Sequence, residues 1–128
     1  TNKSINKIFN EDGEKYFREI EEKIIIEILN NKNFVFSLGG GAIVNKNIRN
    51  ILKKHSYNIY LEVEINILTE RLINSKNRPL IKDKNIKKTL SKLFHEREKF
   101  YKMADLIINN EGKLMDVVKN ITNKIKNL

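Results

Sequence analysis

The sequence predicts a single α/β domain in which helices cover a parallel sheet. Short apolar runs alternate with amphipathic helical patterns, three glycines in a row follow the first apolar run, and 128 residues suit one hydrophobic core. This alternation indicates parallel strands, because each return to the same edge of a sheet requires a crossover connection.

The first half of the chain is predicted to run from helix to strand to helix. Ser4 is suited to cap a short helical turn over residues 4–9, and apolar residues spaced by three and four predict an amphipathic helix over 14–29. The apolar run 34–38, FVFSL, predicts a buried strand. A helix is expected over about 45–55, where two early asparagines can serve as its cap.

The second half repeats the alternation around one polar loop. Apolar runs predict two strands and amphipathic patterns predict three helices; the ranges are 58–63 and 105–109 for strands, and 64–73, 86–102 and 114–128 for helices. The polar loop at about 74–85 holds the only proline, Pro79. Ligands of parallel sheets bind beyond the carboxyl ends of strands, so the glycines after residue 38 lie where a ligand is expected.

Composition excludes several classes of protein and leaves one open. The chain has no cysteine, so it forms neither disulfides nor thiolate metal sites. No apolar run reaches the roughly 18 residues of a membrane span, and a cytoplasmic protein without a membrane partner is expected. The net charge of +9 comes from scattered lysines without interleaved aromatic residues, which favours a solvated surface over nucleic-acid binding.

The glycine run Gly39–Gly41 has two readings. In the first reading, a backbone without side chains lets a ligand lie against the main chain and accept hydrogen bonds from its N–H groups. In the second reading, the glycines only form a flexible turn between strand and helix. The phosphate-binding pattern G-x-x-x-x-G-K-[ST] is absent from these residues and from the rest of the sequence. Gly39–Gly41 are therefore not an ATP-holding loop.

Arginine is used sparingly, since only five of the 25 basic residues are arginines. In a chain that otherwise uses lysine, an arginine suggests a need for a planar, bidentate donor. Three segments that contain an arginine and the segment with the glycine run occur in a fixed order: EDGEKYFREIEE (11–22), SLGGGAIV (37–44), NRPLI (77–81) and HEREKFYKMADLII (95–108). In order and spacing, they resemble the shikimate kinase family from near Ser4 to the end of the chain.

The resemblance implies the three-layer α/β/α fold of P-loop kinases, similar to nucleoside monophosphate kinases. Residues 1–128 would form one domain with a lid loop at about 74–85. In that family a βαβ unit with the phosphate-binding loop precedes the matching region. We therefore expect a fold incomplete at its N-terminus, inactive alone, with the main ligands of ATP and Mg²⁺ in the preceding segment and no metal ligand here.

The resemblance also assigns roles to individual residues. Shikimate binding falls to Arg18 and Arg97, which would grip its carboxylate, to Glu21, which would orient Arg18, and to Gly39, Gly40 and Gly41, which would line the site through their backbone. ATP-side roles fall to Arg71 near the adenine, to Lys113 as a weaker adenine-side contact, and to Arg78 as the lid arginine over the transferring phosphates. The intact enzyme is expected to be a monomer.

Three alternatives stay open at this point. The chain could be part of another small-molecule P-loop kinase, such as a gluconate kinase, with a different acceptor. The chain could also be a basic, non-catalytic module that binds nucleic acid or another anion. Finally, Arg18 could simply pair on a helix surface with Glu14 or Glu22, and Arg97 with Asp105.

Overall fold

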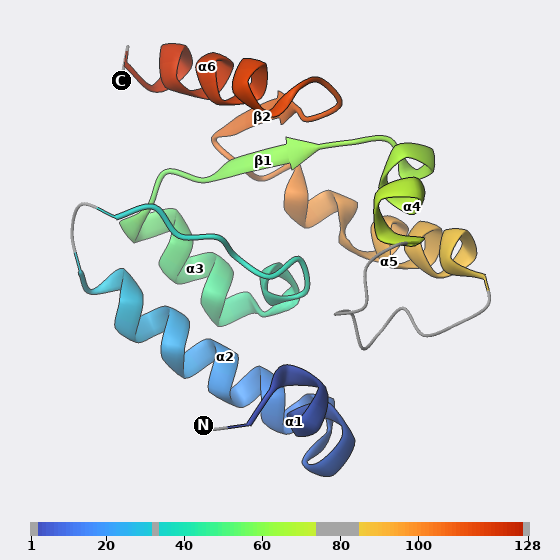
Figure 1. The fold of residues 1–128 in the computed structure, drawn as a ribbon. Coiled ribbons are helices and arrows are strands. Elements are labelled where there is room, and N and C mark those ends of the chain that lie inside the picture. Colours follow the sequence, from blue (N-terminus) through green and yellow to red (C-terminus); the bar gives the residue numbers. More distant parts are fainter. Residues whose placement is uncertain (1–2, 32–33, 74–84, 127–128) are drawn as a thin grey trace. The chain divides into compact units, whose positions relative to one another are not determined.

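The computed structural model describes residues 3–31, 34–73 and 85–126 (Figure 1). These residues form two compact units. The N-terminal unit contains the described residues up to Tyr57, and the C-terminal unit contains those from Asn58 onwards.

The N-terminal unit is built from helices. They are α1 (Ile5–Glu11), α2 (Gly13–Leu29), the short 3-10 helix η1 (Ala42–Val44) and α3 (Lys46–His55). The Ser4 hydroxyl accepts a hydrogen bond from the backbone N–H of Lys7, which confirms Ser4 as the cap of the first helix. The predicted asparagine cap of α3 is Asn45, whose side-chain oxygen accepts from two N–H groups of the first turn.

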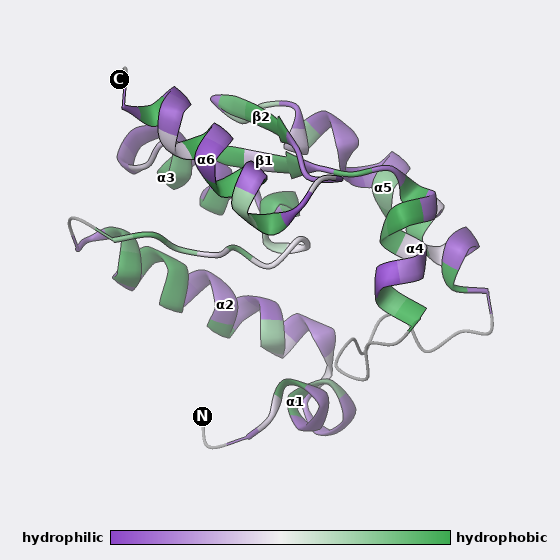
Figure 2. Ribbon diagram, turned by 45° about the horizontal axis from the view of Figure 1, so that its top comes forward, coloured by the Kyte–Doolittle hydropathy of each residue, from purple (hydrophilic) through white to green (hydrophobic). Residues whose placement is uncertain are grey.

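A small apolar core joins the helices of this unit. Its buried residues are Ile25 and Leu29 from α2, Ala42 from η1, and Ile48 and Leu52 from α3. The second half of α2, which supplies two of them, is largely hydrophobic in Figure 2. Burial of these side chains fixes α2 against η1 and α3, and so holds the segment after the glycines beside α2.

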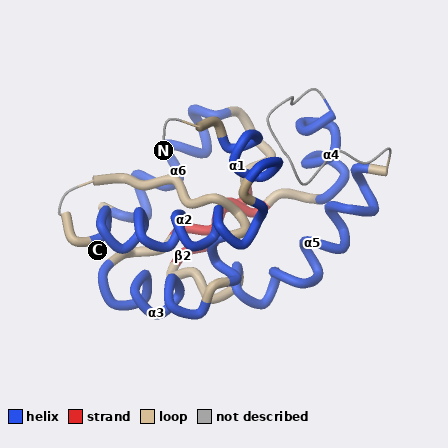
Figure 3. The backbone as a smooth tube through the Cα atoms, turned by 90° about the horizontal axis from the view of Figure 1, so that it is seen from below, coloured by secondary structure: helices blue, strands red, loops and turns tan. Residues whose placement is uncertain are grey.

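The predicted strand over 34–38 is wrong. The structure assigns no strand to these residues, which Figure 3 draws as a loop leading to the glycines. The described residues contain a sheet of two strands, and neither is this segment. A strand requires hydrogen bonds to a neighbour, and FVFSL has no strand partner there. Accordingly, its side chains are not buried, and Val35 is fully exposed at 103%.

The C-terminal unit has the predicted parallel strand pairing. Its elements are β1 (Ile59–Glu62), α4 (Ile65–Ile73), α5 (Ile86–Tyr101), β2 (Leu106–Asn109) and α6 (Leu114–Ile125). Strands β1 and β2 pair in parallel with Ile59 opposite Leu106 and Glu62 opposite Asn109. The two strands and three helices predicted for this half are confirmed, with bounds that differ by at most three residues; residues 127 and 128 of the last predicted helix lie outside the described residues.

Carboxylates close the strand pair at both ends. Before the strands, Asp105 Oδ2 accepts from the backbone N–H of Asn58 at 2.7 Å and from its side-chain amide at 3.2 Å. After the strands, Glu111 Oε1 accepts from the backbone N–H of Glu64 at 3.1 Å. A two-stranded sheet is weak by itself, so these side-chain bonds fix where β1 and β2 start and stop.

The predicted lid loop lies almost wholly outside the described residues. This holds for Arg78 and Pro79, while Asn85 at its end caps α5 by accepting from the N–H of Lys88. Within the part of the chain that is described, no helix is both long and apolar enough to cross a membrane.

Candidate functional site

Arg18 lies near the middle of α2, held by two carboxylates of the same helix. Its Nη1 donates to Glu21 Oε2 at 2.6 Å, and its Nε and Nη2 donate to Glu14 Oε1 at 3.3 and 3.0 Å. Because Glu14 and Glu21 lie four residues before and three residues after Arg18, the helix brings all three to one face. The guanidinium also lies 5.2 Å from the centre of the Phe17 ring.

These contacts keep Arg18 charged. Partial burial opposes the charge of the guanidinium, but the hydrogen bonds and negative charges of Glu21 and Glu14 outweigh it, and the pKa of Arg18 is raised. The side chain of Glu21 is 13% exposed, against 49% for Glu14. The bond to Glu21 is thus the better shielded of the two.

The glycine turn lies directly against this pair. A Cβ placed on Gly41 would come within 2.5 Å of Arg18 Nη2 and 2.9 Å of its Cζ and Nη1. A Cβ on Gly39 would lie 3.0 Å from Glu21 Oε1. The structure therefore brings together Arg18, Glu21 and the glycines that the sequence singled out, all within the N-terminal unit.

A second arginine fixes the turn that follows the glycines. Arg49 Nη1 donates to the carbonyl oxygens of Ile43 at 2.8 Å and of Val44 at 2.7 Å. Backbone bonds from Ala42 to Gly39 and from Val44 to Gly41 complete the turn. The resemblance gave Arg49 no role, yet it stabilises the segment on which Arg18 rests.

The pairing of Arg18 with Glu14, one of the alternatives drawn from the sequence, is confirmed, and Glu14 accepts two of the three hydrogen bonds of Arg18. The other partner considered, Glu22, instead accepts from Asn45 Nδ2 at 2.6 Å and Asn47 Nδ2 at 3.0 Å. Sequence reasoning missed these bonds of Glu22, because they join residues over 20 positions apart.

The remaining predicted residues that the structure describes belong to the C-terminal unit. Arg97 lies half-buried on α5, Arg71 is exposed in the last turn of α4, and Lys113 is the exposed residue before α6. Asp105, considered above as an ion-pair partner of Arg97, instead binds Asn58. Among the described residues, Arg97 has no ion pair.

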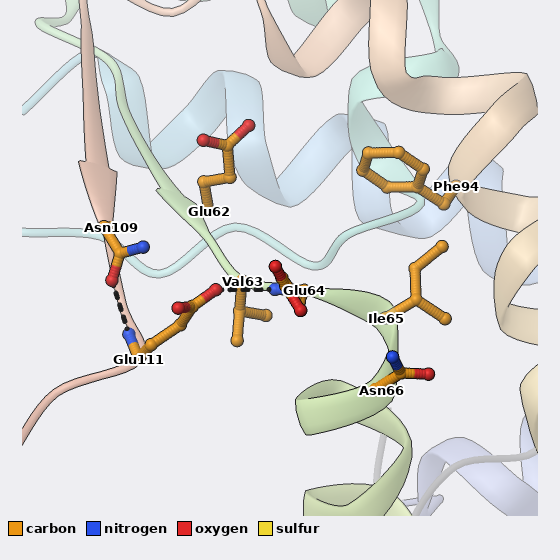
Figure 4. A pocket seen from close by; sticks show the side chains of 8 residues that line it. All are labelled: Glu62, Val63, Glu64, Ile65, Asn66, Phe94, Asn109 and Glu111. Carbon is orange, nitrogen blue, oxygen red and sulfur yellow. Dashed lines mark hydrogen bonds between the residues drawn. The ribbon is translucent and has the colours of Figure 1, made fainter.

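A pocket of about 460 Å³ opens in the C-terminal unit beyond the carboxyl ends of β1 and β2 (Figure 4). It is lined by Glu62, Val63, Glu64, Ile65, Asn66, Phe94, Asn109 and Glu111. Figure 4 shows Glu111 bridging the two strand ends, with its N–H donating to Asn109 and its carboxylate accepting from the N–H of Glu64. Three carboxylates line this pocket, and their charge disfavours a phosphate group there.

The described residues also bear on metal binding. Across residues 3–31, 34–73 and 85–126, no three His, Cys, Asp or Glu side chains are grouped to hold a metal ion.

Comparisons with known proteins identify the family of the chain. The family model described as shikimate kinase matches residues 1–126. The chain is 41% identical over 123 residues to a shikimate kinase of Sulfurihydrogenibium sp., covering 95% of this chain and 73% of that protein. It is 40% identical over 123 residues to the shikimate kinase of Francisella philomiragia, covering 94% of this chain and 68% of that protein.

The solved structures that resemble this chain are also shikimate kinases. The shikimate kinase of Acinetobacter baumannii, solved in complex with shikimate, superposes with a TM-score of 0.92 at 31% identity, covering 97% of this chain and 70% of that one. The enzyme of Aquifex aeolicus superposes with a TM-score of 0.80 at 32% identity, covering 96% and 72%. These matches confirm the predicted α/β fold of P-loop kinases, and the chain belongs to the shikimate kinase family.

Proposed function

We propose that this chain supplies the acceptor-binding part of a kinase that transfers the γ-phosphoryl group of ATP to the 3-hydroxyl of shikimate. The observation that carries the proposal is the arrangement of Arg18, held by Glu14 and Glu21 against the glycine turn. Such an arginine offers a fixed, charged, planar donor, which suits a carboxylate acceptor. The family membership gives that carboxylate an identity, shikimate.

The proposed acceptor roles are divided among three elements. Arg18 and Arg97 bind the carboxylate of shikimate, and Glu21 orients Arg18 through their 2.6 Å hydrogen bond. Gly39, Gly40 and Gly41 leave the backbone open to the ring of the acceptor. We also propose that residues 1–128 form one shikimate kinase domain, as the family match over residues 1–126 supports.

The nucleotide-side roles fall to exposed basic residues. Arg71 and Lys113 are proposed to lie near the adenine of ATP, and both side chains are exposed and available for such a contact. Arg78, outside the described residues, is proposed to cover the transferring phosphates and stabilise their negative charge. Mg²⁺ would neutralise the phosphates of ATP, and we propose no ligand for it among the residues described.

The proposed reaction forms one bond and breaks another. The 3-hydroxyl oxygen of shikimate bonds to the γ-phosphorus as the bond from that phosphorus to the β–γ bridging oxygen breaks. ADP leaves, and the hydroxyl proton is released. Because such a transfer needs little covalent help from the protein, the task of Arg18 is to hold the acceptor in place.

A coupled assay of ADP release by the complete gene product tests this proposal. We expect ATP-dependent phosphorylation of shikimate and little activity with gluconate, which has a different shape beyond its carboxylate. Preference for gluconate would assign the chain to another small-molecule kinase. Absence of kinase activity together with salt-sensitive binding to nucleic acid would favour the basic-module alternative.

Location and assembly complete the proposal. ATP is abundant in the cytoplasm, and we place the reaction there. We also propose a monomer, because every residue given a role above comes from one chain. Size-exclusion chromatography with light scattering tests the second point, and a stable dimer would contradict it.

A further inference from the structure

The contact between Arg18 and Gly41 raises the question of why residue 41 is a glycine. Gly41 has φ −89° and ψ −21°, which is ordinary right-handed backbone that alanine adopts more readily than glycine. Gly13 differs, since its φ of +82° is a conformation that other residues rarely adopt. The backbone therefore requires a glycine at position 13 but not at position 41.

Space, rather than backbone conformation, excludes a side chain at Gly41. Three guanidinium atoms of Arg18 lie between 2.5 and 2.9 Å from the place where a Cβ would be. Such distances are far shorter than the roughly 3.5 to 4.0 Å of a favourable carbon contact. The guanidinium thus occupies the volume that a methyl group at residue 41 would fill.

The neighbouring contact at Gly39 holds the partner of Arg18 in the same manner. A Cβ there would lie 3.0 Å from Glu21 Oε1, while Glu21 Oε2 accepts the 2.6 Å hydrogen bond from Arg18. Gly41 therefore lies against the guanidinium of Arg18, and Gly39 lies against the carboxylate of Glu21. The fit is tighter at Gly41, where the Cβ would approach three atoms instead of one.

We propose that Gly41 is a positioning residue for acceptor binding: its missing side chain lets the Arg18 guanidinium lie against the main chain, in the orientation that binds the carboxylate of the acceptor. This inference rests on the proposed function and adds a residue that acts through Arg18. It replaces the role of lining the acceptor, proposed above for Gly41, with that of holding Arg18, because the guanidinium covers the α-carbon of Gly41.

The consequence of a methyl group at Gly41 follows from which atoms can move. The atoms that it would meet are the far end of a flexible side chain, so the guanidinium shifts and the backbone stays. Replacing glycine by alanine in a compatible conformation also lowers the entropy of the unfolded chain. Gly41→Ala should therefore keep the backbone fold while displacing Arg18, and this entropy gain offsets part of the cost of a weakened bond between Arg18 and Glu21.

The experiment compares Gly41→Ala with the unchanged enzyme in the complete gene product. We expect the KM for shikimate to rise about ten- to a hundredfold, as for the loss of one or two charge-assisted hydrogen bonds. The KM for ATP should change less than about twofold, and the variant should still unfold cooperatively, as a folded domain does. An unchanged KM for shikimate in a folded variant would overturn the inference.

Gly13→Ala is the matched control. It introduces the same methyl group at a glycine with nothing within 4 Å, but at a strained φ. We expect a lower melting temperature with the KM for shikimate nearly unchanged. If both variants raised that KM equally, the effect of Gly41→Ala would come from a general disturbance of α2 and not from the position of Arg18.

A double-mutant cycle with Arg18→Lys shows whether Gly41 acts through Arg18. Lysine lacks the planar group that meets the new methyl, so adding Gly41→Ala to Arg18→Lys should raise the KM for shikimate by less than about threefold. Independent, multiplicative effects would mean that residue 41 touches the acceptor itself, and would refute the positioning role.

A crystal structure of Gly41→Ala without ligands separates this inference from the proposed function. A displaced guanidinium over an unchanged backbone supports the positioning role even if the enzyme prefers an acceptor other than shikimate. An undisplaced guanidinium refutes it even if the enzyme phosphorylates shikimate.

Discussion

Arg18 in the N-terminal unit and Arg97 in the C-terminal unit are proposed to bind the same carboxylate, yet the protein holds them differently. Arg18 makes hydrogen bonds to Glu14 and Glu21 and lies against Gly41. Arg97, half-buried on α5, has no ion pair among the residues that the structure describes. Carboxylates of its own helix hold Arg18, whereas the described residues provide no such partner for Arg97.

From this difference we expect the two arginines to contribute unequally to the stability of the protein and to the binding of the acceptor. Ordering a long side chain upon binding costs about 0.5 to 1.5 kcal/mol, and Arg18 is already ordered. Conversely, removing Arg18 leaves the partly buried Glu21 without its donor. Arg18 should therefore matter to both stability and binding, and Arg97 to binding alone.

The largest expected effects come from replacing each arginine by lysine in the complete gene product. Arg18→Lys should raise the KM for shikimate roughly ten- to a hundredfold, because lysine cannot reproduce the planar bidentate donor. Arg97→Lys should raise it in the same direction. The KM for ATP should stay within about threefold in both; equal losses for both substrates would argue against carboxylate binding.

The variants Arg18→Met and Arg97→Met test whether the two arginines differ in their contribution to the free energy of unfolding. We expect Arg18→Met to lower the free energy of unfolding by about 1 to 3 kcal/mol, the cost of leaving a partly buried polar group unpaired. Arg97→Met should change it by less than about 0.5 kcal/mol. Urea unfolding followed by circular dichroism measures both, and equal losses would remove the distinction drawn above.

The side-chain contact of Asn45 with α2 should contribute a similar amount to the free energy of unfolding. Asn45 caps α3 and also donates to Glu22, so Asn45→Ala removes a cap and a side-chain contact between helices. We expect a loss of about 1 to 2 kcal/mol in the free energy of unfolding. Asn50→Ala, at an exposed position on the same helix, is the control and should be neutral or slightly stabilising.

A smaller effect is expected from the two carboxylates that bind Arg18. Glu21→Gln weakens the better shielded bond and should raise the KM for shikimate about three- to tenfold, with the KM for ATP unchanged. Glu14→Gln affects a more exposed pair and should raise it less than about threefold. The reverse order would mean that Glu14 is the main partner of Arg18.

The smallest expected effect is a pH dependence in the C-terminal unit. Tyr60 stacks on Tyr101 with ring centres 5.1 Å apart; its burial and then the charge of Glu62 raise the pKa of Tyr60 above its ordinary 10.0. The unfolded chain therefore loses this proton first, and stability falls as the pH rises above 10. Tyr60→Phe should flatten that part of the profile; an unchanged slope in urea unfolding would contradict the assignment.

Local patterns predicted much of the fold. Helix periodicity located α2 and α5, and candidate caps located the starts of α1 and α3, because both signals depend on residues within a few positions of each other. The strand predicted over 34–38 failed because strand formation depends on a partner distant in sequence, and an apolar run does not reveal whether that partner is available. The strands predicted over 58–63 and 105–109 are confirmed as β1 and β2, because the two segments pair with each other.

The candidate site shows the same division. Arg18 and Glu21 could be placed on one helical face from their spacing alone. The fit of the guanidinium against Gly41 could not, because it depends on the path of a turn more than 20 residues away. The bonds from Arg49 to Ile43 and Val44 were missed for a related reason, since they require the turn to present its carbonyl oxygens toward α3.

The conformation of Gly41 has a consequence for engineering this family. Filling glycines that have right-handed backbone angles is a common way to raise thermal stability, and by its angles Gly41 qualifies. A design guided by backbone geometry alone would select this residue, and by our proposal the resulting protein would bind its acceptor more weakly. Backbone angles are therefore an insufficient guide at this position, because the space that a new methyl group would fill belongs to Arg18.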